Sequence, residues 1–252
     1  MKTIKFPLIT LEETPSTNSY LKEMHKKGLA QEGTVVRSIT QTAGRGQIGN
    51  HWESESEKNL TFSVLLYPPS LSVRQQFLLS EMAALAVLKT LEKELSDVCI
   101  KWPNDIYYKD KKICGILIEN EIEGALISSS IIGIGWNVNQ LLFKSNAPNP
   151  VSMKQITGRQ YDLDQLLDTF VSCFHDSYAM LQSDPFQIEK EYRQHLYHGE
   201  KYHSFWDKNG EFTARIVEIK SDGYLVLSTK ESEIRSYLFK EVSFFPDRFL
   251  MG

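Results

Sequence analysis

Apolar and polar positions recur along the chain with two different spacings, which predict both helices and strands. From residue 72 to about residue 95, the apolar residues fall three and four apart and form one stripe: Phe77, Leu78, Met82, Leu85, Leu88 and Leu91. Such a stripe is typical of a helix that packs on a core, and Ser72 followed by Gln75 is a capping-box signature for its start. Residues 59–67 are mostly apolar over a short run, which favours a buried strand.

The same reasoning predicts a layer of strands with helices around it for the first 195 residues. Ser16, Thr17 and Asn18 precede a periodic run that stops at Gly28, as an N-capped helix does. Further helices are expected at residues 163–182 and 186–195, and strands at residues 33–40, 59–67, 98–108, 112–121 and 124–136. The last three strands would form successive hairpins. The expected fold class is therefore α+β, a mixed sheet with flanking helices.

The chain changes character after residue 195. Short strands are expected at residues 212–219, 224–227 and 234–238, with a hairpin turn at Asp222-Gly223. This unit is too short to build a deep pocket of its own. We therefore expect two domains, residues 1–195 and residues 196–252, and we expect the second to support the site or the protein partner of the first.

The segment Lys101-Trp102-Pro103-Asn104-Asp105 interrupts the strand expected at residues 98–108. Pro103 has no N–H for a sheet ladder, so the strand must bulge or end there. A lysine that enters a strand among aromatic residues is costly to bury unless an anion meets it. The break can aim Lys101, Asn104 and Asp105 into a cleft. The alternative is a lysine at a strand end with its stem packed and its charge in water.

A second segment, residues 41–52, carries an arginine among glycines. Gly44, Gly46 and Gly49 have the spacing of a dinucleotide-binding turn, but that turn opens a helix directly after a strand. Here the following residues are polar, lack helical periodicity and lead into another strand, so we expect a mobile loop between two strands. Glycine lets the backbone approach a ligand, and Arg45 supplies a planar charge suited to phosphate or carboxylate.

Composition narrows the class of protein. The chain has 252 residues, with 28 basic and 32 acidic side chains and a net charge of −4, which argues against a general nucleic-acid binder. There is no apolar stretch long enough for a signal peptide or a membrane span. The three cysteines lie in apolar surroundings without CxxC spacing, which favours reduced thiols and a cytoplasmic location. They are Cys99, Cys114 and Cys173.

No metal site is expected from the sequence. His195, His198 and His203 form a loose cluster, but no cysteine or carboxylate completes a regular metal-ligand spacing.

Five motifs in order along the chain resemble those of the biotin protein ligases. They are Ser16-Thr17-Asn18, the GRG loop with Trp52 behind it, KWPND at residues 101–105, KKICGILIE at residues 111–119, and GIGWNVN at residues 133–139. The resemblance implies a catalytic domain like that of class II aminoacyl-tRNA synthetases, followed by a small SH3-like β barrel. Regulatory members of that family carry a helix-turn-helix domain before the catalytic one. Here the first motif begins at Ser16, so we expect the short form and no operator DNA binding.

The resemblance also implies a reaction. Biotin and ATP would give biotinyl-5′-adenylate and pyrophosphate, and a lysine of a biotin carboxyl carrier protein would then attack the mixed anhydride. Mg²⁺ would accompany ATP and keep several of its waters, so no dedicated carboxylate cage is expected. The implied partners are biotin, ATP and the carrier protein, without nucleic acid or membrane; monomer and homodimer both remain open.

The site residues carried over by the resemblance fall into three groups. The proposed catalytic cations are Lys101 and Arg45. The proposed biotin-binding residues are Ser16, Thr17, Asn18, Gln41, Arg45, Gly46, Gln47 and Lys101. The proposed ATP-binding residues are Trp52, Asn104, Asp105, Lys112 and Asn137.

Several of these assignments have a chemical reason and an alternative. The ureido head of biotin presents two N–H donors and one carbonyl, which hydroxyls and amides such as those of Ser16, Thr17 and Gln41 can match. The alternative for Ser16 and Thr17 is a structural helix cap. Gly133 and Gly135 would let the backbone pass close to the ligand, or would mark a strand bulge.

Gln47 departs from a common family pattern, in which a second arginine follows the GRG loop. Glutamine donates hydrogen bonds without charge, so either other contacts close the loop or the adenylate is held less tightly. Two alternative functions stay open as well. One is a lipoate or octanoate ligase or transferase on the same scaffold, and the other is a non-catalytic protein that binds biotin.

Overall fold

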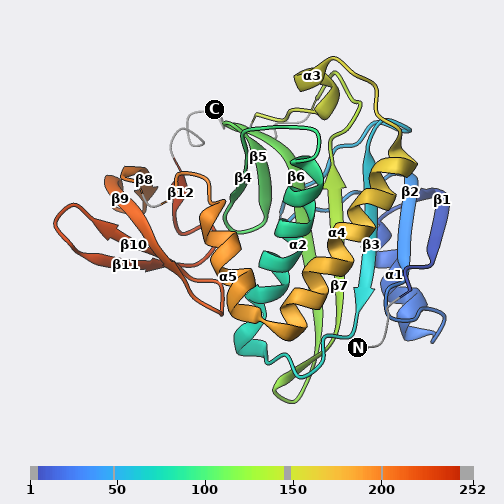
Figure 1. The fold of residues 1–252 in the computed structure, drawn as a ribbon, viewed down its shortest axis with the longest axis horizontal. Coiled ribbons are helices and arrows are strands. Elements are labelled where there is room, and N and C mark those ends of the chain that lie inside the picture. Colours follow the sequence, from blue (N-terminus) through green and yellow to red (C-terminus); the bar gives the residue numbers. More distant parts are fainter. Residues whose placement is uncertain (1–4, 48, 145–148, 200, 245–252) are drawn as a thin grey trace.

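The computed structural model describes residues 5–47, 49–144, 149–199 and 201–244 (Figure 1). Its larger part is a seven-stranded sheet with the strand order β1-β2-β3-β7-β6-β5-β4. The strands are β1 (Leu8–Thr14), β2 (Val35–Gln41), β3 (Leu60–Leu66), β4 (Val98–Lys101), β5 (Asp105–Tyr108), β6 (Lys111–Glu123) and β7 (Leu126–Trp136). β1 and β2 are parallel and the other neighbours are antiparallel, so the mixed sheet expected from the sequence is confirmed.

Three long helices cover one face of this sheet. α2 (Phe77–Leu91), α4 (Leu163–Ser183) and α5 (Pro185–Gln194) run across the front of the sheet in Figure 1. A 3-10 turn (Val73–Gln75) precedes α2, and the short α3 (Met153–Thr157) precedes α4. α1 (Thr17–Lys26) packs against β2, β3 and β7.

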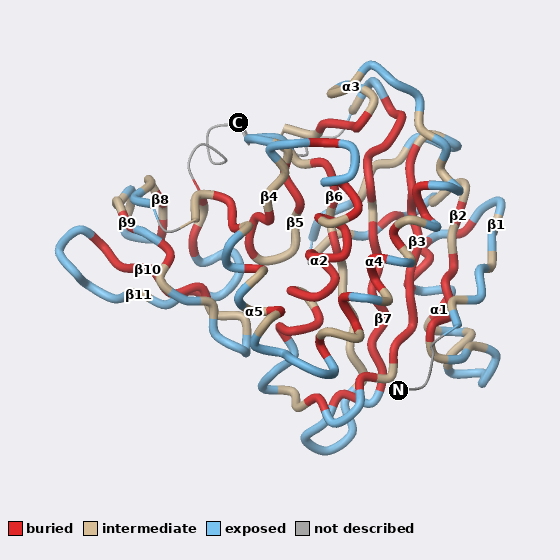
Figure 2. Tube along the Cα trace, viewed as in Figure 1, coloured by how far each residue is buried: buried red, intermediate tan, exposed pale blue. Residues whose placement is uncertain are grey.

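Strand β3 shows how the sheet divides its side chains between two faces. Phe62 is fully buried in the main core, and its ring centroid lies 4.9 Å from that of Phe170 in α4. The next residue, Ser63, points the other way, because successive strand residues alternate, and contacts the first residues of α1. Figure 2 shows buried backbone concentrated in the central strands and the helices across them. The helix-covered face therefore carries the main core, and α1 lies on the opposite face.

The C-terminal region forms a separate sheet. It contains β8 (His203–Asp207), β9 (Gly210–Ile219), β10 (Leu225–Thr229), β11 (Ile234–Tyr237) and β12 (Ser243–Phe244), in the order β11-β10-β9-β8-β12. All neighbours are antiparallel, which confirms the small all-β unit. This unit is joined to the large sheet, because the Trp102 indole N–H donates to the Gly223 carbonyl at 3.0 Å. The domain boundary at residues 195 and 196 stays a prediction.

The structure corrects the expected elements in three places. The strand expected at residues 98–108 is two strands, and β4 ends at Lys101, in keeping with the break at Pro103. The helix expected from residue 72 begins only at Phe77, and the Ser72 hydroxyl donates to the Gln75 side chain without capping the helix. β1, α3, β8 and β12 were not predicted, because short or half-exposed segments lack a strong hydrophobic period.

Two further observations concern membranes and metals. Within the residues that the structure describes, no helix combines the length and the apolar character needed to cross a membrane. The described ranges also contain no group of three or more His, Cys, Asp or Glu side chains placed to hold a metal ion.

Candidate ligand-binding site

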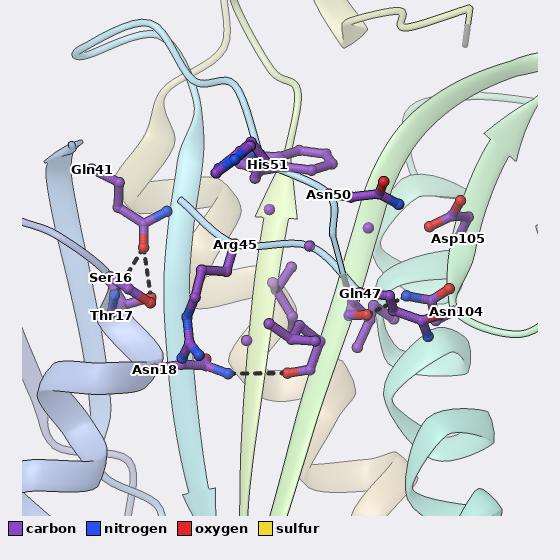
Figure 3. A pocket seen from close by; sticks show the side chains of 18 of the residues that line it. Ser16, Thr17, Asn18, Gln41, Arg45, Gln47, Asn50, His51, Asn104 and Asp105 are labelled. Atoms are coloured by element: carbon purple, nitrogen blue, oxygen red, sulfur yellow. Dashed lines mark hydrogen bonds between the residues drawn. The ribbon is translucent and has the colours of Figure 1, made fainter. Parts of the chain in front are cut away.

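A cleft lies on the face of the sheet opposite to the three long helices, and it collects most of the residues singled out in the sequence (Figure 3). The expected site residues that line it are Ser16, Thr17, Asn18, Gln41, Arg45, Gly46, Gln47, Trp52, Asn104, Asp105 and Lys112. Its volume is about 100 Å³. Sites for drug-sized ligands usually occupy about 300–1,000 Å³. The cleft is therefore narrow, and residues of the glycine loop line it.

One end of the cleft is built from hydroxyls and amides at the start of α1. The Gln41 Oε1 atom accepts from the Thr17 backbone N–H at 2.8 Å and from its hydroxyl at 3.2 Å. Ser16 occupies the N-cap position with an extended backbone, but within the described residues its side chain makes no capping hydrogen bond. The interpretation of Ser16 as a side-chain cap is therefore wrong. Ser16 lines the cleft instead.

Ser63 and Glu119 support this end of the cleft and were not predicted. The Ser63 hydroxyl lies 2.7 Å from the Thr17 hydroxyl and 2.6 Å from Asn18 Oδ1. The Asn18 amide donates to the Leu117 carbonyl at 3.3 Å and to Glu119 Oε2 at 2.8 Å. A polar residue within an apolar strand was the available signal for both, but their partners are distant in sequence.

The glycine loop between β2 and β3 is a narrow hairpin. The Trp52 N–H donates to the Gly44 carbonyl at 3.0 Å, and the Gly46 N–H donates to the Asn50 carbonyl at 2.9 Å. A Cβ atom at Gly44 would lie 2.6 Å from the Trp52 carbonyl oxygen, so only glycine fits there. The described loop residues form no helix, as expected, which excludes a dinucleotide-binding turn.

Glycines on the strands form the floor of the cleft. Gly133 pairs with Ser63 and Leu117, and Gly135 pairs with Thr61 and Gly115, all in continuous register. The bulge reading of this segment is therefore wrong. A Cβ atom at Gly133 would overlap the Asn18 amide, and one at Gly135 would overlap the Trp52 indole. The missing side chains leave the room in which Asn18 and Trp52 lie.

Two cations line the cleft, and each is paired with a carboxylate. An Arg45 guanidinium nitrogen lies 2.9 Å from Glu119 Oε2, and Lys112 Nζ lies 2.7 Å from Asp105 Oδ1. Lys112 also lies over the Trp52 ring, 5.6 Å from its centroid. An anionic ligand in the cleft would thus meet a positive charge near each end of the glycine floor.

Lys101 is placed differently from the expectation, because it is not among the described residues that line the cleft. It is 6% exposed, and Nζ donates to the Tyr107 hydroxyl at 3.1 Å and lies 5.3 Å from the Phe244 ring centroid. Burial lowers the pKa of Lys101 to about 8, against the opposing effect of Asp105. The rings of Tyr107 and, from the C-terminal domain, Phe244 lie around the Lys101 amine.

Asn137 also stands outside the described cleft lining. It is 2% exposed, and its backbone N–H donates to the Ile113 carbonyl at 2.9 Å. Phe239 of the C-terminal domain does line the cleft, although no motif or pattern in the sequence pointed to it. Its ring lies 6.3 Å from that of Trp102. The C-terminal domain therefore contributes directly to the wall of the cleft.

Two cleft residues keep buried polar atoms without a hydrogen-bond partner among the described residues. They are the Gln47 carbonyl oxygen Oε1 and the Trp52 indole nitrogen Nε1. An unsatisfied buried polar group costs about 1–3 kcal/mol. Their position in the cleft suits groups that pair with a ligand.

These features define a ligand-binding α+β domain whose cleft combines a hydroxyl and amide end, a glycine floor and two cations. Residues 10–137 match the model of the biotin/lipoate A/B protein ligase family. The chain belongs to the biotin/lipoate A/B protein ligase family.

Individual relatives agree with this assignment. The chain is 31% identical to the bifunctional ligase/repressor BirA of Bacillus spizizenii over 82% of this chain and 65% of that protein. It is 30% identical to the biotin–[acetyl-CoA-carboxylase] ligase of Paracoccus denitrificans over 69% of this chain and 73% of that protein. The biotin protein ligase of Aquifex aeolicus, solved in complex with biotin and ATP, superposes with a TM-score of 0.77 at 27% identity and covers 94% of this chain and 97% of that one. The match spans just under two thirds of the Bacillus relative.

Proposed function

We propose that the protein activates biotin with ATP to biotinyl-5′-adenylate and transfers the biotinyl group to a lysine of a biotin carboxyl carrier protein. The observation that carries this proposal is the continuity of one cleft, which joins the hydroxyls and amides around Thr17 to Arg45 and Lys112 over a glycine floor. One end suits an uncharged ureido ring, and the rest suits a carboxylate and phosphates. The relatives named as biotin ligases support the same function.

The hydroxyl and amide end would hold the head of biotin. Ser16, Thr17 and Gln41 can accept from its two N–H groups and donate to its carbonyl. Ser63 keeps Thr17 and Asn18 in position, because its hydroxyl lies within hydrogen-bond distance of both. Gly135 leaves space above the strand for a flat ligand once Trp52 moves from the floor.

Charge stabilisation is the main demand of adenylate formation. The biotin carboxylate attacks the α-phosphorus, the bond to the bridging oxygen of pyrophosphate breaks, and negative charge accumulates on the phosphate oxygens. Arg45 and Lys112 both lie in the cleft to meet that charge, and each is partly neutralised by a carboxylate, Glu119 and Asp105 respectively. Lys101 remains our second catalytic cation, because its amine is poorly solvated and on the same face of the sheet as Asp105.

Mg²⁺ would accompany ATP in this reaction. Asp105 is the one carboxylate among the described cleft residues, and Asn104 beside it carries an amide oxygen. One carboxylate with substrate phosphates and water is a donor set that Mg²⁺ commonly uses, so these residues fit the ion. The bound ion would neutralise charge on the phosphate oxygens of ATP.

The second step needs water to be kept from the mixed anhydride. Gln47 and Phe239 line the cleft together with Asn104, and the Trp52 indole lies over Gly135 of its floor. With the glycine loop closed, the indole and the phenyl ring would shield the adenylate until the acceptor amine arrives. The amine then attacks the acyl carbon, and AMP leaves with the anhydride oxygen. We propose a cytoplasmic carrier as acceptor.

The experiment that tests the proposal is exchange of labelled pyrophosphate into ATP, measured with biotin, lipoate and octanoate in parallel. We expect exchange that depends on biotin. Exchange with lipoate or octanoate but not with biotin would favour the ligase alternative on the same scaffold. Tight biotin binding without exchange would favour the non-catalytic alternative.

A further inference from the structure

Glu119 joins two parts of the cleft through one oxygen atom. It lies on β6, and its Oε2 accepts from the Asn18 amide at 2.8 Å and from the Arg45 guanidinium at 2.9 Å. Asn18 belongs to α1, whereas Arg45 belongs to the glycine loop. Figure 3 shows the Arg45 side chain extending along the cleft to the Asn18 amide. A single carboxylate therefore ties the loop to the helix.

This contact occupies the group expected to bind the ligand. A guanidinium fork matches a carboxylate, and Glu119 already presents a carboxylate to Arg45. An incoming anion must replace Glu119 at Arg45 or share the guanidinium with it, and the two anions repel each other. The Arg45 and Glu119 side chains are 44% and 26% exposed, so the pair is weak enough to exchange.

We propose that Glu119 is a positioning residue that holds Arg45 over the ligand-free cleft and yields it to the carboxylate of the substrate. That a substrate carboxylate replaces Glu119 rests on the proposed function. The ion pair by which Glu119 holds Arg45 of the glycine loop does not. Asn18 keeps Glu119 in place after the exchange, because its amide donates to the same oxygen. Glu119 therefore stays bonded to Asn18 while Arg45 changes its partner.

Glu121 offers a matched control on the same strand. Its carboxylate lies 3.3 Å from His25 at the other end of α1 and accepts from the Ser129 hydroxyl at 3.0 Å. Glu119→Gln removes the charge at Arg45 and keeps an oxygen for the Asn18 amide. Glu121→Gln makes the same chemical change away from the glycine loop.

The first measurement is limited trypsin digestion of the ligand-free protein, with cleavage after Arg45 followed by mass spectrometry. Glu119→Gln should accelerate that cleavage several-fold, because Arg45 loses its ionic partner, and Glu121→Gln should not. Equal rates in the wild type and Glu119→Gln would overturn the hold on the loop. This readout is independent of biotin and therefore separates the inference from the proposed function.

The second measurement is calorimetric titration with biotin, together with the rate of biotin-dependent pyrophosphate exchange. Glu119→Gln should tighten biotin binding by about two- to fivefold, the range of an exposed ion pair, and should change kcat by less than it changes the affinity. The gain should vanish in the Arg45→Ala background. Weaker biotin binding by Glu119→Gln, or a gain in affinity that persists without Arg45, would contradict the proposal that the substrate carboxylate replaces Glu119 at Arg45. A wild type that fails to bind biotin would instead contradict the proposed function.

Discussion

The two faces of the seven-stranded sheet use neighbouring residues for different tasks. On β3, Phe62 is buried against α4, and Ser63 supports Thr17 and Asn18 at the cleft. The helix-covered face is filled by large apolar side chains, whereas the open face carries glycines, hydroxyls and paired charges. The difference shows that this sheet gains its stability on one side and holds its chemistry on the other.

The open face also carries features that lower the stability of the fold. It keeps buried polar atoms of Gln47 and Trp52 that find no partner in the described part of the chain, and a lysine whose pKa is lowered by burial. Each of these features opposes folding to some degree. The packed face offsets them, because it buries complete side chains such as Phe62 and Phe170.

The largest expected effect on stability concerns the packed face. Phe62→Ala removes a fully buried ring that meets Phe170, and should lower the free energy of unfolding by about 3–5 kcal/mol. The folded fraction should still exchange pyrophosphate in the presence of biotin. Urea unfolding with parallel activity measurements at low temperature checks this. Loss of activity in fully folded protein would show that the two faces are not independent.

The largest expected effect on activity concerns Lys101. Lys101→Ala should slow biotin-dependent pyrophosphate exchange by about 100- to 1,000-fold, equivalent to ~3–4 kcal/mol in the barrier, because a preorganised cation is lost. Lys111→Ala, a change at an exposed lysine on β6, is the matched control and should be neutral. Exchange by Lys101→Ala within a few-fold of wild type would transfer the role to Lys112, which the structure places in the cleft.

Titration of Lys101 should make biotin affinity and the free energy of unfolding change in opposite directions as the pH rises. Its pKa of about 8 lies below the ordinary value of 10.5, so its charge is present at neutral pH and is lost as the pH rises through 8. Biotin affinity should therefore fall above pH 8, by at most about tenfold per unit. Between pH 8 and 10.5 the unfolded chain binds more protons, so this residue makes stability rise with pH.

Titration calorimetry and urea unfolding across pH 7–9.5 check both trends. Burial raises the pKa of Glu81 on α2 to about 8, so Glu81→Gln is the necessary control and should leave the fall in biotin affinity intact. A fall in affinity that survives in Lys101→Ala would assign the titration to another group.

The smallest expected effect concerns Gln47. Gln47 lines the cleft, and its buried carbonyl oxygen has no hydrogen-bond partner among the described residues, so Gln47→Ala should weaken biotin binding by about two- to tenfold, the range of one neutral hydrogen bond. Release of free biotinyl-adenylate should rise at the same time. Gln194→Ala, at an exposed glutamine at the end of α5, provides the control. If calorimetry and an adenylate-release assay both show no change, Gln47 leaves the list of site residues.

Local patterns in the sequence predicted the packed face well. The apolar stripe of α2 and the short apolar run of β3 depend only on nearby residues, and both elements exist. β1 escaped prediction because it is a half-exposed edge strand that gains its order from parallel pairing with β2. Local periodicity carries little information about such a strand.

The sequence predicted only those cleft residues that lie in a recognisable motif or carry a characteristic side chain. Arg45, Asn104 and Lys112 carry chemistry in recognisable segments, and all three line the cleft. Glu119 and Ser63 were missed because their partners lie in α1 and in the glycine loop, far away in sequence. Lys101 lies beside Phe244 of the C-terminal domain, which no local pattern connects to β4.

The most direct test of the separation between the two faces is a paired measurement on Phe62→Ala and Ser63→Ala. Each purified variant is assayed for urea unfolding and for biotin-dependent pyrophosphate exchange in the same samples. Ser63→Ala should cost about 1–3 kcal/mol of stability and slow exchange about tenfold or more, because Thr17 and Asn18 lose their support. Phe62→Ala should lose more stability and keep exchange close to wild type. Losses of stability and exchange in the same proportion for both variants would contradict the account.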